Sequence, residues 1–79
     1  MAKSIVLQLL PQVSVLYRYG IIDEQQKKKL SNLLRYSCKN DDFLQKFREE
    51  VEALYDRAET ERDRTGINYI LRQLNQNNI

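Results

Sequence analysis

The sequence predicts an all-α protein, a small bundle of three main helices with a short fourth helix at the C-terminus. Apolar residues recur at steps of three and four in four separate blocks, which is the spacing of one helix face. Only two glycines and one proline interrupt the chain. The second and third blocks each follow an Asp-x-x-Gln pattern that can cap a helix. We therefore expect one helical domain over residues 1–75 and a polar tail over 76–79.

The first helix is expected over about 4–19, with a break near Pro11. Ser4 is a suitable N-cap, and Gly20 can end the helix in the left-handed conformation. Pro11 has no amide proton and crowds the preceding turn, so it should kink or interrupt the helix. Apolar residues cover well over half of the circumference of this helix, which is more than one neighbour can cover.

The second helix is expected over 24–37, because Asp23 and Gln26 form a capping box just before it. Its apolar residues are Leu30, Leu33, Leu34 and Cys38. The three leucines match an LxxLL pattern, which can bind a groove on a partner, but a chain this short needs them for its core. Cys38 is interpreted as a small apolar filler of the core.

The third helix is expected over 43–64, opened by a second capping box at Asp42 and Gln45. It carries a regular seam that resembles a coiled coil, made of Leu44, Phe47, Val51, Leu54 and Ala58. Together with the first two helices, this seam predicts a core of Leu9, Val13, Leu16, Leu30, Leu33, Leu34, Phe47, Val51 and Leu54.

A short fourth helix is expected over 66–75. The apolar residues after Ala58 fall on a different helical phase, and Gly66 lies where the phase changes. A straight helix could not bury both sets against one neighbour, so we expect a break at Gly66, with Thr65 as the cap of the last helix.

Composition argues against catalysis and metal binding. The chain has no histidine and one cysteine, so it lacks the usual general base, a Cys/His nucleophilic pair and the ligands of a zinc site. We expect no enzyme activity and no cofactor. A single cysteine also forms no internal disulfide, which predicts a reducing compartment, the cytoplasm or the nucleus. The apolar run at residues 5–10 is too short for a membrane span, so no membrane insertion is expected.

Charge is distributed unevenly along the chain. Residues 1–40 hold seven Lys/Arg and two Asp/Glu, whereas residues 41–79 hold six and nine. The two halves should therefore attract each other. Two arrangements satisfy this attraction: an acidic third helix folded onto a basic second helix, or head-to-tail contact between copies of the chain.

The basic second helix raises an alternative function, a helical nucleic-acid-binding regulator. A helix-turn-helix protein would present such a face to DNA. The candidate residues are Lys27, Lys28, Lys29, Asn32 and Arg35. The acidic second half and the low net charge of +2 argue against nucleic acid as the partner.

The function that we predict is a non-enzymatic protein–protein interaction or self-assembly module, forming part of a larger protein and binding through apolar helix faces. The partner is a second polypeptide or another copy, with a dimer as the expected assembly. The surplus apolar residues of the first helix and the out-of-phase C-terminal set should form the shared surface. The predicted interface residues are Val6, Leu10, Tyr17, Ile67, Ile70, Leu71 and Leu74.

Overall fold

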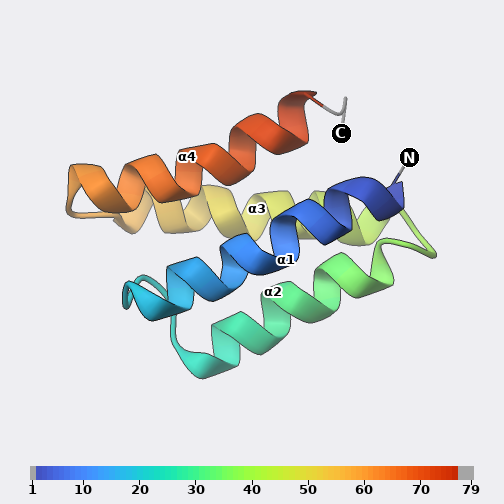
Figure 1. The fold of residues 1–79 in the computed structure, drawn as a ribbon, viewed down its shortest axis with the longest axis horizontal. Coiled ribbons are helices and arrows are strands. Elements are labelled where there is room, and N and C mark those ends of the chain that lie inside the picture. Colours follow the sequence, from blue (N-terminus) through green and yellow to red (C-terminus); the bar gives the residue numbers. More distant parts are fainter. Residues whose placement is uncertain (1, 77–79) are drawn as a thin grey trace.

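The chain folds into a bundle of four helices, which confirms the predicted all-α class (Figure 1). The computed structural model describes residues 2–76, with side chains from residue 5 onward. The helices are α1 (Ala2–Arg18), α2 (Glu24–Tyr36), α3 (Asp42–Arg57) and α4 (Glu61–Gln76). Each helix packs against two neighbours, in the cyclic order α1, α2, α3, α4, so that α1 lies diagonally across from α3.

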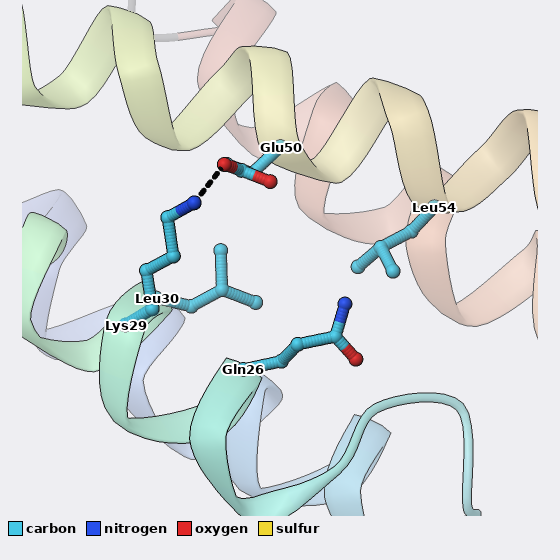
Figure 2. Close-up of a pocket in the computed structure, with 5 residues that line it drawn as sticks. All are labelled: Gln26, Lys29, Leu30, Glu50 and Leu54. Carbon is cyan, nitrogen blue, oxygen red and sulfur yellow. Dashed lines mark hydrogen bonds and ion pairs between the residues drawn. The ribbon is translucent and has the colours of Figure 1, made fainter.

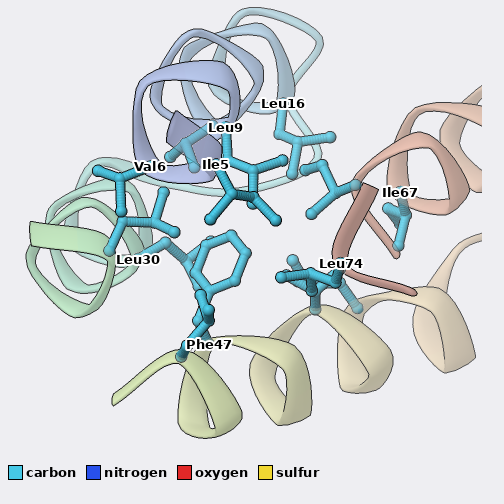
Figure 3. Packing of buried hydrophobic residues seen from close by; sticks show 14 of the residues in the cluster. Ile5, Val6, Leu9, Leu16, Leu30, Phe47, Ile67 and Leu74 are labelled. Atoms are coloured by element: carbon cyan, nitrogen blue, oxygen red, sulfur yellow. The ribbon is translucent and has the colours of Figure 1, made fainter. Parts of the chain in front are cut away.

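The core is one apolar cluster to which all four helices contribute. In Figure 3, Phe47 of α3 and Leu74 of α4 point toward Ile5 and Leu9 of α1. Of the predicted core residues, only Leu33 is half-buried, and the other eight are buried. The buried apolar residues among those described are Ile5, Val6, Leu9, Val13, Leu16, Ile22, Leu30, Leu34, Leu44, Phe47, Val51, Leu54, Ile67, Ile70 and Leu74.

The predicted break in the first helix is wrong, because α1 runs without interruption through Pro11. Pro11 is exposed, and the carbonyl that loses its amide partner belongs to Leu7, one turn earlier on the same exposed side. Water can satisfy a carbonyl there, so the helix continues. The proposed cap Ser4 lies inside α1, which begins at Ala2.

The corner between α1 and α2 forms as predicted. Gly20 has a φ of 78°, and the amides of Gly20 and Ile21 donate to the carbonyls of Tyr17 and Leu16. These two bonds form a Schellman motif, which ends α1. The capping box that opens α2 is also confirmed: the Gln26 amide donates to Asp23 Oδ1 at 2.8 Å, and the Asp23 amide donates to Gln26 Oε1 at 3.3 Å.

The end of α2 differs from the prediction, because Ser37 and not Cys38 enters the core. Cys38 is exposed, whereas Ser37 is buried and its hydroxyl donates to the Leu34 carbonyl. The helix ends at Tyr36, and a tighter turn follows in which the Cys38 amide donates to the Arg35 carbonyl. This turn rotates Cys38 out of the helical position that placed it in the core.

The start of α3 also differs. Asp42 is the first residue of the helix and not its cap, and the N-cap Asp41 makes no hydrogen bond through its side chain. The predicted second capping box is therefore wrong. The side chain that satisfies this end is Asn40, whose Oδ1 accepts from the Asp42 amide at 2.9 Å.

The chain breaks between α3 and α4 at 58–60, not at Gly66. Ala58 is extended, and Thr60 Oγ1 accepts from the Asp63 amide at 3.1 Å, which caps α4. The predicted third helix is therefore too long and the predicted fourth too short. The Thr-x-x-Asp pattern at residues 60–63 carried this cap signal, and Thr65, the expected cap, lies inside α4 with its hydroxyl donating to the Glu61 carbonyl.

Candidate functional site

The structure divides the predicted interface residues into two groups. Val6, Ile67, Ile70 and Leu74 are at most 5% exposed and belong to the core. The expectation that the C-terminal set has no place inside the chain is wrong. Because α4 is a separate helix, its apolar row can face the core independently of the phase of α3. These four residues are not available to a partner of the folded chain.

Leu10, Tyr17 and Leu71 remain at the surface, but they do not form one patch. Tyr17 is 40% exposed, with the Lys27 ammonium 4.8 Å from the centre of its ring, so it lies at the junction of α1 and α2. Leu10 is half-buried and lies two turns before Tyr17 on the same side of the helix. Leu71 lies instead in a groove between α3 and α4.

One apolar residue of this surface was not among the predicted ones. Leu7 is 72% exposed, more than any other large apolar side chain described. With Leu10, Ser14 and Tyr17 it follows the i, i+3, i+7, i+10 spacing of a single helical row. No charged residue occurs from Ile5 to Tyr17. That absence is a sequence signal that some apolar residues of this helix stay outside the core, although it does not indicate which row.

The predicted nucleic-acid residues separate in a similar way. Lys29 pairs with Glu50 of α3, as Figure 2 shows, and Lys27 lies over the Tyr17 ring. The side chains of Lys28, Asn32 and Arg35 are exposed and make no hydrogen bond or ion pair with residues 2–76. Exposed Lys39 continues their row by one more step of four residues.

The Lys29–Glu50 pair supports one of the two arrangements expected from the charge pattern, the basic α2 folded onto the acidic α3. Both side chains are partly exposed to solvent, so the pair contributes only about 0–1 kcal/mol to stability. In Figure 2 it lies beside Leu30 and Leu54, which supply the buried contact between the two helices. The pair therefore adds little to the contact between α2 and α3, which depends mainly on buried apolar side chains.

Three further acidic residues of α3 lie on its solvent side, and one of them, Glu49, also lines the groove between α3 and α2. Glu49, Glu52 and Asp56 follow helical spacing on the solvent side and are exposed. Glu52 and Asp56 also line an open groove of about 350 Å³, together with Tyr55, Asn68 and Leu71. This groove combines negative charge with two half-buried apolar side chains.

Two features are absent from the described part of the chain, a metal-binding cluster and a membrane-spanning helix. No group of three Cys, Asp or Glu side chains that could hold a metal ion occurs among residues 2–76. Within the same range, no helix combines the length and the apolar character needed to cross a membrane. The features that remain are surfaces: an apolar row beside a basic row on α1 and α2, and an acidic groove on α3 and α4. Comparison with protein families, curated proteins and solved structures found no match for this chain.

Proposed function

We propose that this chain is a non-enzymatic protein–protein interaction or self-assembly module that binds through an exposed apolar helix face. The observation that carries this proposal is the uncharged outer row of α1, with Leu7 72% exposed at its start. The solvent sides of the other helices carry charged residues throughout. Covering a large apolar side chain that is left in water on this uncharged row is favourable, so a partner that buries it gains free energy.

The size of the surface fits a modest interface. Burying a leucine fully is worth about 1.5–3 kcal/mol, and Tyr17 adds a large ring whose hydroxyl can stay in water. Leu10 lies between them and is already partly covered by the chain itself. Of these residues, Tyr17 is the type that is enriched in binding hot spots, and the two leucines add apolar area beside it.

The test is to place a charge in the row without touching the core. Leu7→Glu should abolish association, measured by sedimentation of the purified chain and by pull-down of binding partners, while circular dichroism stays that of a folded helical protein. The matched control is Ala53→Glu, which introduces the same side chain at an exposed position of α3. If Leu7→Glu associates like the parent chain, the α1 row is not the binding surface.

The alternative function, nucleic-acid binding, is favoured by the exposed row of Lys28, Asn32, Arg35 and Lys39. Three cations give a short electrostatic contact, and affinity from phosphate contacts falls steeply with salt. We expect no retention on DNA or RNA at about 0.15 M salt, where exposed charges are screened beyond roughly 8 Å. Retention that is lost in the double variant Lys28→Glu/Arg35→Glu would rank this function first.

A further inference from the structure

The cyclic order of the helices sets two different surfaces on opposite sides of the bundle. The side formed by α1 and α2 lies across from the side formed by α3 and α4, because each helix packs only against its two neighbours in the ring (Figure 1). What is exposed on one side is therefore unable to meet what is exposed on the other within a single chain.

The first of these sides is apolar and basic. The row of Leu7, Leu10 and Tyr17 lies on α1, and exposed Lys28 and Arg35 lie on the neighbouring helix α2, which the Lys27–Tyr17 contact connects to the row. We call these five residues, Leu7, Leu10, Tyr17, Lys28 and Arg35, the apolar-basic face. The side chains of both cations are unpaired within the described residues.

The opposite side holds a groove that is partly apolar and acidic along its α3 edge, with exposed Arg64 and Arg72 one turn to either side of Asn68 on its α4 edge. Glu52, Tyr55 and Asp56 of α3 and Asn68 and Leu71 of α4 line its groove. We call these five residues the acidic face. Glu52 and Asp56 have no ion-pair partner among residues 2–76, and Tyr55 and Leu71 are half-buried at the edge of the core.

We propose that copies of this chain associate head to tail, with the apolar-basic face of one copy on the acidic face of the next. This proposal rests on the proposed function and names its partner, a second copy. Unpaired cations on one face meet unpaired carboxylates on the other, and exposed apolar side chains meet half-buried ones. The sequence alone already allowed head-to-tail contact, and the bundle now supplies two complementary surfaces for it.

A symmetric dimer is disfavoured by the same charges. Pairing two apolar-basic faces would bring Lys28 and Arg35 of both copies together, and pairing two acidic faces would do the same for Glu52 and Asp56. Like charges in close contact oppose association, whereas opposite charges select the partner. Because the two complementary faces lie on opposite sides of one molecule, each added copy presents a free face to the next, and the assembly grows as an open chain or closes as a ring.

Two variants, each with one face disabled, test this arrangement. Leu7→Glu disables the apolar-basic face, and Glu52→Lys/Asp56→Lys disables the acidic face. Each substituted residue is exposed, so both variants should keep the helical circular dichroism of the parent. The matched control is Asp41→Lys/Glu59→Lys, which changes net charge equally at exposed positions outside the helices.

Sedimentation equilibrium should show that the parent and the control form species larger than a dimer as concentration rises. Each disabled variant alone should stay monomeric over the concentration range in which the parent assembles. Its apparent dissociation constant should be raised about tenfold or more, the change that 1.4 kcal/mol produces. An equimolar mixture of the two variants should form a one-to-one dimer and nothing larger, because each supplies the face that the other lacks.

Three results would overturn the proposal, and they separate it from the proposed function. If the acidic-face variant assembles like the parent while Leu7→Glu is monomeric, the apolar-basic face binds itself and the head-to-tail contact is wrong. A parent chain that stays monomeric at all concentrations, yet captures a different protein through Leu7, would retain the proposed function and refute self-association. Two monomeric variants that fail to combine when mixed would also refute the contact.

Discussion

Helices α1 and α4 both carry apolar residues that the sequence suggests for an interface, but the bundle treats the two helices differently. In α4 the row of Ile67, Ile70 and Leu74 faces inward and is completely buried. In α1 an inward row is buried in the same way, and a second row that starts at Leu7 stays in solvent. An apolar row becomes a surface when the inward face of its own helix is already occupied. Its phase relative to the preceding helix is irrelevant once a loop separates the two.

The largest difference in stability should appear between two alanine variants, one in the buried row of α4 and one in the exposed row of α1. Ile70→Ala should lower the free energy of unfolding by about 2–5 kcal/mol, because it leaves a cavity in the core. Leu7→Ala should change that free energy by no more than about 0.5 kcal/mol, since the side chain is mostly in water. Urea denaturation followed by circular dichroism, at a concentration where the chain is monomeric, measures both. Equal losses in the two variants would remove the distinction between the rows.

A smaller loss of stability should show where α4 begins. The burial of the apolar row of α4 depends on this start, because a separate helix can turn its row toward the core. Thr60→Ala should cost about 0.5–2 kcal/mol, because the Asp63 amide loses its acceptor. Thr65→Ala is the matched change inside the helix and should be neutral or slightly stabilising, since alanine is the better helix former. Thermal unfolding of the two variants gives the comparison. If Thr65→Ala were the more destabilising of the two, the last helix would begin near Gly66, as the sequence predicted. The apolar row of α4 would then again lie on a different helical phase from the row of α3.

The smallest effect concerns Gly66 itself. Gly66→Ala should raise the free energy of unfolding by about 0.4–1 kcal/mol, because it restricts the unfolded chain and improves helix propensity. The added Cβ would meet Leu16 Cδ2 at 3.6 Å, an ordinary van der Waals contact between α4 and α1. Gly20→Ala is the informative contrast and should destabilise by about 1–2 kcal/mol, since its φ of 78° is left-handed. A destabilising Gly66→Ala, measured in the same urea titration, would mean that α1 and α4 approach more closely here than described.

Several elements were fixed by local patterns in the sequence. The all-α class follows from the repeat of apolar residues at steps of three and four, and the corner at Gly20 and Asp23 follows from side chains within one turn of each other. Most of the core was predictable because Leu9, Leu34 and Phe47 each lie at the centre of an amphipathic stripe. These features depend on neighbours in the chain, which the sequence shows directly.

Other elements were decided by the packing of the four helices. Pro11 is tolerated because the bundle leaves its side of α1 in water, and Ile70 is buried because a complete α4 closes the ring against α1 and α3. The sequence showed that the first helix carries too many apolar residues, but it could not say which row would remain outside. That choice depends on where neighbouring helices lie, because the hydrophobic effect rewards burial against any partner and specifies none.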